Sequence, residues 1–307
     1  MKIVVTGVTG QVGHELVRSL QPIGEVVALD SRALDLADPA AVTATLAAVA
    51  PAVVVNPAAY TAVDKAETEI ERARAINAIA PGAMASHCAR HGALLVHYST
   101  DYVFDGTGSR PYREDDPTAP ANAYGRTKLE GEQAIRASGC AHLILRTSWV
   151  YSLHGANFLR TMVRLAAARE RLSIVADQHG APTPASFIAD VTAQLLARRG
   201  VDPARRDWSG VLNLAPAGNT TWFDYASLGL GILHRATQAA GDDEARLPRA
   251  GWRVPRLPTL APIAASEYPT PAARPANSRL DLERIQALWG LRMPPWDELL
   301  ATVLRDA

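Results

Sequence analysis

The 307-residue chain is predicted to be an α/β protein, with a doubly wound parallel sheet of the Rossmann-like kind and a smaller C-terminal substrate-binding domain. Three observations lead to this prediction. Short β-branched runs alternate with alanine-rich helical stretches, the first run ends in a glycine-rich turn, and the regular alternation stops near residue 149. The runs lack strict polar alternation, as expected of parallel strands that helices cover on both faces.

The elements follow from this alternation in chain order. Strands are expected at residues 3–6, 25–30, 53–56, 94–99, 142–146 and 211–214. Helices are expected at residues 11–21, 40–49, 68–90 with a break near Pro81, 124–137, 157–169 and 187–198. Residues 1–148 are therefore assigned to a dinucleotide-binding domain, to which segments from about 172–215 return. Residues 149–307 are assigned mainly to the substrate-binding domain.

A proline-rich stretch from residue 241 to residue 275 interrupts the second half. Proline lacks the backbone N–H that helices and central strands need, so an extended loop is expected here. Two interpretations are open: a lid over the substrate, or a surface insertion without function.

The balance of charges limits which classes of binding partner are expected. Lysine plus arginine (31) equals aspartate plus glutamate (31), so there is no long-range field for a nucleic-acid backbone or an anionic membrane. The two cysteines, Cys88 and Cys140, favour neither a disulfide framework nor a zinc site. The chain opens directly into a strand, and no apolar run reaches the roughly 20 residues of a membrane span. A cytoplasmic protein with a small-molecule partner is expected, with neither nucleic acid nor membrane as a partner.

The first strand runs into a turn that reads Thr6-Gly7-Val8-Thr9-Gly10-Gln11-Val12-Gly13, and a helical pattern follows. Glycine permits a tight turn and lets the backbone approach a pyrophosphate, while the helix N-terminus presents free N–H groups to the anion. The turn, including Gln11 and Val12, is therefore a candidate cofactor site. Its G-x-x-G-x-x-G spacing resembles the extended branch of the short-chain dehydrogenase/reductase superfamily.

The choice between NADH and NADPH stays open. Asp30 ends the second strand, where a carboxylate accepts hydrogen bonds from ribose hydroxyls, which favours NADH. Arg32 follows, and its guanidinium would suit the 2′-phosphate of NADPH. Other candidate cofactor contacts follow later strands at the same sheet edge: Asp35, Leu36, Ala58, Ala59, Tyr60, Thr61 and Tyr98.

Tyr124 and Lys128 are spaced i, i+4 on a predicted helix, which puts both side chains on one face. A phenol can protonate a forming alkoxide, and a positive charge about 4 Å away contributes about 4 kcal/mol at an effective dielectric of 20. Lys128 is therefore expected to lower the pKa of Tyr124 and to hydrogen-bond the cofactor ribose. Thr100 follows the strand that is expected to end at Ser99, and it is a candidate to bond the substrate carbonyl, with Ser99 as the alternative.

Long motifs resemble the dTDP-4-dehydrorhamnose reductase family. They read His-Tyr-Ser-Thr-Asp-Tyr-Val-Phe at 97–104, Tyr-Gly-Arg-Thr-Lys-Leu at 124–129 and Arg-Thr-Ser-Trp-Val-Tyr at 146–151, with further matches at 63–67, 177–183 and 268–280. The resemblance implies hydride transfer from NADPH or NADH to C4 of dTDP-4-dehydro-β-L-rhamnose, giving dTDP-L-rhamnose. It implies that Tyr124 protonates the C4 oxygen, that Thr100, Asp101 and Trp149 contact the sugar, and that Arg274 meets the diphosphate.

Two other enzyme or protein classes share parts of this pattern. A sugar-nucleotide dehydratase or epimerase would use the same Tyr/Lys pair, but dehydratases resemble Thr-Asp-Glu where this chain has Tyr102 after Thr100 and Asp101. A non-catalytic regulatory subunit also resembles these reductases. Family members that dimerise through Mg²⁺ use two acidic positions; Glu15 matches one, but Ser186 stands at the other, which disfavours a metal-bridged dimer. Monomer and homodimer both remain expectations.

Overall fold

The computed structural model describes residues 1–199, 209–241, 243, 249 and 251–307. Its centre is a six-stranded parallel sheet in the order β10-β5-β4-β3-β1-β2, which confirms the predicted fold class. The strands are β1 (Lys2–Thr6), β2 (Glu25–Leu29), β3 (Val53–Asn56), β4 (Leu94–Thr100), β5 (Ala141–Thr147) and β10 (Gly210–Asn213).

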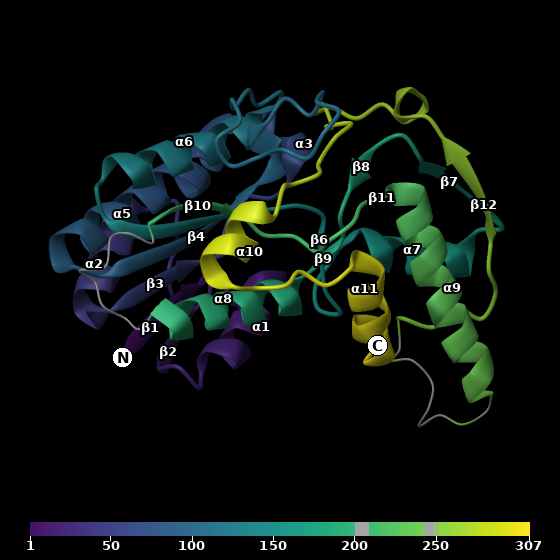
Figure 1. Cartoon of the computed structure of the whole chain (residues 1–307), viewed down its shortest axis with the longest axis horizontal. Helices are drawn as coiled ribbons and strands as arrows, with labels where there is room; N and C mark the ends of the chain where they lie inside the picture. Colours follow the sequence, from purple (N-terminus) through teal and green to yellow (C-terminus); the bar gives the residue numbers. More distant parts are fainter. Residues whose placement is uncertain (200–208, 242, 244–248, 250) are drawn as a thin grey trace.

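Helices cover both faces of this sheet (Figure 1). Alternate residues of β1 explain why: Ile3 and Val5 belong to one apolar core, and Val4 belongs to another. The first core includes residues of α1 (Gln11–Leu20) and α8 (Ala185–Arg199), and the second includes residues of α2 (Pro39–Val49), α5 (Ala80–His91) and α6 (Ala123–Ala137). The doubly wound arrangement follows from strands that are apolar on both sides.

The helix expected at 68–90 differs from the prediction. It consists of α4 (Ile70–Arg74), a π-helix η1 (Ala75–Ile79) and α5, and it follows the short α3 (Val63–Ala66). Pro81 lies in the first turn of α5 and does not break the helix. Pro81 has no N–H for the carbonyl of Asn77, and a Cβ on Gly131 of α6 would lie only 2.1 Å from that carbonyl oxygen. The π-helix therefore replaces the expected break and brings Asn77 against α6.

The second half builds a smaller unit around its own apolar core. Its elements are β6 (Val150–Tyr151), α7 (Phe158–Ala168), β7 (Arg171–Val175), β8 (His179–Gly180), β9 (Thr183–Pro184), β11 (Thr220–Thr221), α9 (Trp222–Ala240), β12 (Thr259–Ile263), the 3₁₀ turn η4 (Ala265–Glu267) and α11 (Trp296–Arg305). In Figure 1, α7, α9, β7 and β12 lie together, beside the large sheet.

Two boundaries differ from expectation. Segments within about 172–215 were expected to return to the large domain. Of these, β10 pairs with β5 in the large sheet and α8 packs in the first core, whereas β7 pairs with β12 in the smaller unit. The helix α10 (Glu283–Trp289) also returns, and packs Ile285 and Trp289 into the first core.

The proline-rich stretch is only partly a loop. Residues 242, 244–248 and 250 of it lie outside the described residues. The described part contains β12, which pairs in parallel with β7, so the expectation of an entirely extended loop is wrong there. Pro262 is tolerated because a two-stranded sheet leaves each strand one free edge, where a missing N–H costs no ladder hydrogen bond.

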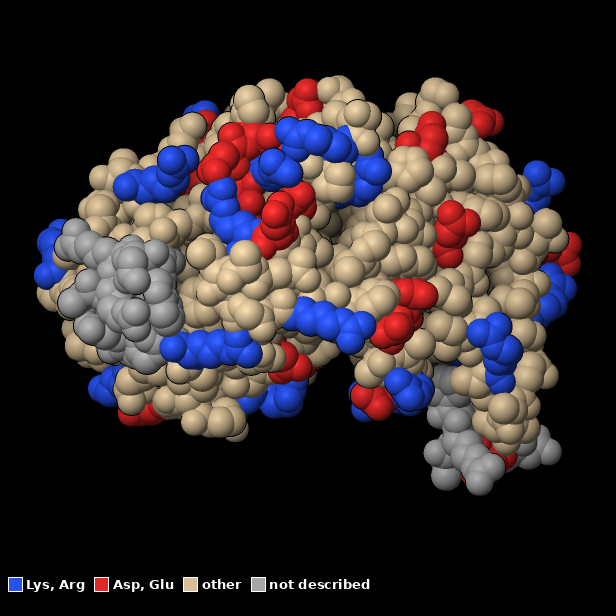
Figure 2. Space-filling model, in the orientation of Figure 1, with Lys and Arg blue, Asp and Glu red and all other residues tan. Residues whose placement is uncertain are grey.

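Acidic and basic side chains are interspersed over the face seen in Figure 2, in keeping with the balanced composition. Among the described residues, no helix combines the length and apolar character needed to cross a bilayer.

Candidate active site

A cavity of about 570 Å³ opens where the parallel strands end. Strand order β2-β1-β3 places the point of reversal at β1, and ligands of open α/β sheets bind in the crevice outside such a point. Most of the predicted cofactor residues line this cavity: Gly7, Gly10, Gln11, Val12, Gly13, Asp30, Asp35, Leu36, Ala58, Ala59, Thr61, Tyr98, Tyr124 and Lys128.

The glycine turn has the close backbone contacts that the sequence predicted. Gly7 has φ +57°, and its carbonyl accepts a 2.9 Å hydrogen bond from the N–H of Gly10. A Cβ on Gly13 would lie 2.3 Å from the same carbonyl oxygen. No side chain caps the N-terminus of α1, so its first N–H groups remain available to an anion. The hydroxyls of Ser99 and Thr147 also line the cavity, buried and without a protein partner among the described residues. The cavity thus fits a dinucleotide.

We expect Gly13→Ala to weaken cofactor binding at least about tenfold, because the added methyl group forces the turn apart. Calorimetric titration with NADPH measures this. Gly231→Ala in α9 is the matched control, since its Cβ would meet nothing closer than the Arg235 side chain at 3.4 Å. Equal NADPH affinity in the two variants would show that the turn does not hold the cofactor.

Asp30 and Arg32 lie differently with respect to the cofactor cavity. Asp30 lines the cavity, and its Oδ1 accepts hydrogen bonds from the backbone N–H groups of Arg32 (3.0 Å) and Ala33 (2.8 Å). These bonds lower the pKa of Asp30, with Ala33 contributing most. Arg32 is not among the residues that line the cavity, whereas Arg72 of α4 is. The expected contact of Arg32 with a 2′-phosphate is therefore not supported by its position.

Arg32→Ala is expected to change the NADPH/NADH ratio of kcat/KM by less than about threefold, because its side chain lies outside the cavity. Asp30→Ala is expected to lower kcat/KM for NADH about tenfold, since a carboxylate that accepts ribose hydrogen bonds is lost. Steady-state kinetics with both cofactors compare the two variants. If the NADPH/NADH ratio of kcat/KM changes tenfold or more in Arg32→Ala, Arg32 contacts the cofactor.

Tyr60, another predicted cofactor residue, does not line the cavity. Its hydroxyl donates to Glu69 (2.8 Å), while its backbone N–H donates to the buried side chain of Asn77 (2.8 Å). The Asn77 amide also donates to the Tyr60 carbonyl (3.2 Å) and to Thr127 of α6 (3.1 Å). The π-helix therefore holds the loop after β3 in place, and the loop's small residues Ala58 and Ala59 face the cavity.

Three contacts place Tyr124 at the start of α6. Asn122 caps the helix by accepting from the N–H of Gly125 (2.8 Å), and the N–H of Ala123 donates to Glu67 (2.7 Å). A Cβ on Gly125 would lie 2.2 Å from the carbonyl oxygen of Tyr102, so only glycine allows this approach. The ring of Tyr124 consequently meets that of Tyr102 edge-on, with centroids 5.5 Å apart.

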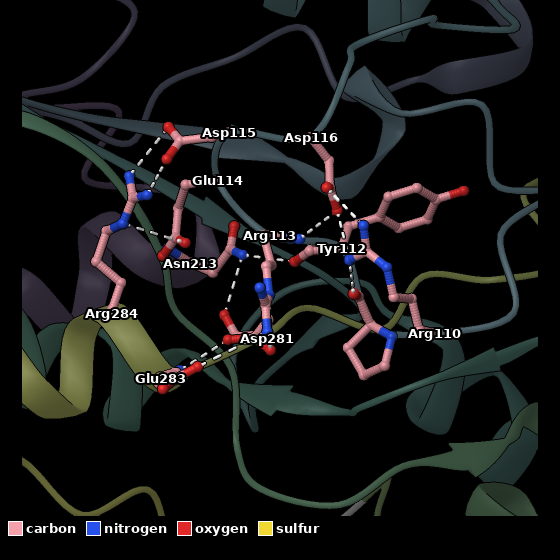
Figure 3. Close-up of polar contacts among 11 residues, drawn as sticks. Arg110, Tyr112, Arg113, Glu114, Asp115, Asp116, Asn213, Asp281, Glu283 and Arg284 are labelled. Carbon is pink, nitrogen blue, oxygen red and sulfur yellow. Dashed lines mark hydrogen bonds and ion pairs between the residues drawn. The ribbon is translucent and has the colours of Figure 1, made fainter.

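The loop that leads to α6 is fixed by a polar cluster (Figure 3). Asn213 of β10 donates from its backbone N–H to Glu114 (2.9 Å) and from its amide to the carbonyls of Tyr112 (2.8 Å) and Asp281 (3.0 Å). Arg284 of α10 pairs with Glu114 and Asp115. Residues far apart in the sequence thus anchor the approach to Tyr124.

The electrostatics of Tyr124 differ from the prediction. Burial raises the pKa of its phenol above the usual value, the charge of Asp101 raises it further, and a hydrogen bond with Thr100 opposes both. Lys128 is not among the groups that cause this shift. Its nitrogen lies 2.6 Å from the carbonyl oxygen of Tyr98 and 3.2 Å from Nε2 of His97. The upward shift runs against the predicted lowering of the Tyr124 pKa, and the role of Lys128 stays a prediction.

Thr100 and Asp101 lie beside the phenol but line neither large cavity. Thr100 ends β4, and its hydroxyl donates to Asp101 (3.0 Å). Asp101 begins the 3₁₀ turn η2 (Asp101–Val103), where burial raises its pKa to about 6 and hydrogen bonds with Ser278 and Thr100 oppose the shift. Both side chains are buried beside Tyr124.

A second cavity of about 590 Å³ lies against the smaller unit. Two predicted substrate residues line it. Trp149 has φ +50°, uncommon for a bulky residue, and its ring stacks on Trp222 with centroids 3.6 Å apart. Arg274 lines this cavity and also donates to the carboxylate of Asp64 (2.8 Å), with which it forms an ion pair.

Several residues that line the two cavities were not predicted from the sequence. In the cofactor cavity these include Arg72, Ile76, Thr147, Val150, Gly155 and Ala156; in the second cavity they include Tyr102, Phe158, Gln178, Trp222, Tyr268 and Ser278. Half of these residues lie within the motifs at 97–104, 146–151, 177–183 and 268–280, where other residues were assigned the contacts. The other half, Arg72, Ile76, Gly155, Ala156, Phe158 and Trp222, belong to segments without a glycine turn or a quoted motif. Trp222 begins α9, a helix whose bounds were not predicted from the sequence.

At the acidic positions considered for Mg²⁺, Glu15 lies 3.8 Å from Arg18, which also pairs with Asp190 of α8 (3.2 Å). Within the described part of the chain, no group of three or more histidine, cysteine or acidic side chains is placed to hold a metal ion.

Comparisons with known proteins agree on one family. A family described as "RmlD substrate binding domain" matches residues 1–307. dTDP-4-dehydrorhamnose reductase of Salmonella typhimurium strain LT2 is 46% identical, covering 97% of this chain and 95% of that protein. The Burkholderia thailandensis reductase is also 46% identical and covers 100% and 99%.

Solved structures give the same result. The reductase from Clostridium acetobutylicum has a TM-score of 0.85 at 33% identity, with 99% of this chain and 98% of that chain covered. The reductase from Bacillus anthracis, solved in complex with NADP, also has a TM-score of 0.85, at 30% identity with 100% and 99% covered. The chain therefore belongs to the dTDP-4-dehydrorhamnose reductase family of NAD(P)H-dependent oxidoreductases, as its motifs predicted.

Proposed function

We propose that this chain reduces the C4 keto group of dTDP-4-dehydro-β-L-rhamnose to give dTDP-L-rhamnose, with Tyr124 as the proton donor. One observation carries the assignment of Tyr124. Its half-buried side chain lines the dinucleotide cavity, while its ring contacts Tyr102, which lines the second cavity. A donor at this boundary is within reach of a group held in either cavity.

The acid-base chemistry fits a reduction. Because the pKa of Tyr124 is raised, the phenol keeps its proton at neutral pH and is in the donor form. An alkoxide is a stronger base than a phenolate, so the proton moves to the sugar oxygen as negative charge develops there. Thr100, whose hydroxyl lies beside the phenol, is proposed to orient that oxygen.

The cofactor residues are proposed to work as follows. A reduced nicotinamide cofactor supplies the hydride when it is bound. The turn from Gly7 to Gly13 would hold its diphosphate, Asp30 its adenosine ribose, and Lys128 the ribose next to the nicotinamide. These residues around a bound dinucleotide would exclude water from the space beside Tyr124.

The substrate is proposed to lie in the second cavity. The stacked rings of Trp149 and Trp222 are proposed to offer a flat apolar surface to the sugar. Asp101, which lies close to Tyr124, is proposed to accept a hydrogen bond from a sugar hydroxyl. Arg274 would meet the diphosphate, exchanging part of its pairing with Asp64 for a phosphate. The choice between monomer and homodimer, and the cytoplasmic location, stay predictions.

The direct experiment mixes the purified protein with dTDP-4-dehydrorhamnose and NADPH and follows absorbance at the wavelength of the reduced nicotinamide. Loss of signal, with dTDP-L-rhamnose identified by mass spectrometry and NMR, is the expected result. A flat signal from protein that still binds NADPH would assign the chain a regulatory role. Formation of an epimer or a dehydrated sugar would assign it to another branch of the superfamily.

A further inference from the structure

Arg72 lines the cofactor cavity, but the mechanism above gives it no task. It lies on α4, about one helical turn before Ile76, which lines the same cavity. Within the described part of the chain its guanidinium makes no hydrogen bond and no ion pair. Arg74, two residues further along, is by contrast paired with Glu71 and Glu130. Arg72 therefore presents an unpaired cation to whatever occupies the cavity.

The order of the strands separates the two ends of this cavity. Asp30 follows β2, whereas Lys128 donates to the carbonyl of Tyr98 on β4. Strands β1 and β3 lie between β2 and β4, so the two ends are about 14 Å apart at about 4.8 Å per strand. The adenosine ribose is proposed to lie at the Asp30 end and the nicotinamide ribose at the Lys128 end.

Two observations place Arg72 toward the adenosine end. Ile76 belongs to the second core, together with cavity-lining residues that follow β2 and β3: Leu34, Leu36 and Ala58. Burial and Glu69 raise the pKa of Tyr60, in the loop after β3, and the positive charge of Arg72 opposes that shift. Arg72 thus lies beside the loop after β3, on the helix face that continues to Ile76.

The adenosine end is otherwise lined by acidic groups. Among the described residues that line the cavity, the ionisable acids and bases other than tyrosine are Asp30, Asp35, Arg72 and Lys128. Both carboxylates accept hydrogen bonds from backbone N–H groups two or three residues further along, at 2.8–3.0 Å. These bonds lower the pKa of Asp30, so it is ionised at neutral pH. A phosphate at this end would be repelled unless a cation met it.

We propose that Arg72 determines how well this cavity accepts NADPH: its guanidinium binds the 2′-phosphate of the adenosine ribose and offsets the repulsion from Asp30 and Asp35. A guanidinium fork matches the oxygens of a phosphate, which carries a charge of about −1.5 to −2 at pH 7. NADH has a hydroxyl group in that place and gains much less. The inference rests on the proposed position of the adenosine ribose at Asp30 and does not depend on which sugar is reduced.

The first test is Arg72→Met, which removes the guanidinium and keeps an unbranched side chain at an exposed position of α4. The Kd for NADPH is expected to rise at least about tenfold, because a charged hydrogen bond to the phosphate is lost. The Kd for NADH is expected to change less than about threefold. Calorimetric titration measures both. An unchanged ratio of the two Kd values, with both cofactors weakened or neither, would overturn the proposal.

Arg74→Met is the matched control. It removes one positive charge from the same helix, but Arg74 lines neither cavity and pairs with Glu130 of α6. Its NADPH/NADH ratio of Kd values is expected to stay within about threefold of that of the parent protein. If the ratio changes equally in both variants, the overall charge of α4 is responsible, which contradicts a direct contact of Arg72 with the phosphate.

A second measurement uses only the adenosine half of the cofactor and needs no activity. Adenosine 2′,5′-bisphosphate and 5′-AMP differ only in the 2′-phosphate. In Arg72→Met, the affinity for the bisphosphate is expected to fall at least about tenfold, and that for 5′-AMP to change less than about threefold. Equal losses for the two nucleotides would place Arg72 at the adenine or the 5′-phosphate and overturn the proposal. If these results are as expected but the parent protein does not reduce the sugar, only the proposed function fails.

Discussion

Tyr124→Phe is expected to lower kcat by about two to four orders of magnitude while NADPH binding is retained, because the change removes the proposed proton donor and keeps the ring. The ring contact with Tyr102 persists in the variant, since phenylalanine presents the same edge. Single-turnover kinetics and a calorimetric titration with NADPH measure the two quantities separately.

Tyr112→Phe serves as the control. Tyr112 donates its hydroxyl to Asp105 in the loop before α6 and lines neither large cavity. Its turnover is expected to stay within about threefold of the parent enzyme, because the two hydrogen bonds of its hydroxyl, to Asp105 and from the N–H of Gly108, involve no residue that lines either cavity. If Tyr124→Phe keeps near-normal turnover, the proton comes from another group and the proposed mechanism fails.

Arg146→Met is expected to lower the free energy of unfolding by about 3–5 kcal/mol, the usual cost of leaving one partner of a buried ion pair alone. The side chains of Arg146 and Glu132 are 3% and 1% exposed, and two hydrogen bonds of 2.9 and 2.6 Å join them. The guanidinium also donates to the carbonyl of Glu114 (3.0 Å) and lies 5.0 Å from the ring centre of Phe104. Unfolding in urea, followed by circular dichroism, gives the difference.

The double variant Arg146→Met with Glu132→Leu tests the physical reason. With both charges gone, no buried carboxylate is left without a partner, so much of the lost stability is expected to return. A single variant that loses less than about 1 kcal/mol would show that Glu132 finds water or another partner. A double variant as unstable as the single one would assign the loss to packing and to the Glu114 contact.

The sheet, the glycine turn and the Tyr124 helix were predictable because their signals are local. A β-branched run next to glycine and then a helical pattern defines a strand, a turn and a helix within a few residues. The π-helix at 75–79 was not predictable in this way. It depends on the approach of Gly131 to Asn77 and on the hydrogen bonds of Asn77 to Tyr60, which only the folded chain brings together.

The same distinction applies to the candidate site. Fourteen predicted cofactor residues line the cavity, and eleven of them do so because they follow the ends of β1, β2 and β3 at one sheet edge. The direction of a side chain was harder to predict. For Arg32, pairing with a 2′-phosphate was one of two open alternatives, and its side chain lies outside the cavity. Lys128 was expected to act on Tyr124, but its nitrogen faces Tyr98 and His97. The pairing of β12 with β7 was also not predicted, because nothing in the sequence of either segment indicates that it pairs with the other.

Isotope tracing tests the central claim most directly. NADPH deuterated at the transferred position of C4 is incubated with the protein and dTDP-4-dehydrorhamnose, and the product is analysed by NMR. Transfer of deuterium to C4 of dTDP-L-rhamnose, one atom per NADPH oxidised, is predicted. Deuterium at another carbon, product without deuterium, or NADPH bound but never oxidised would contradict the assignment of this site to reduction of the sugar ketone.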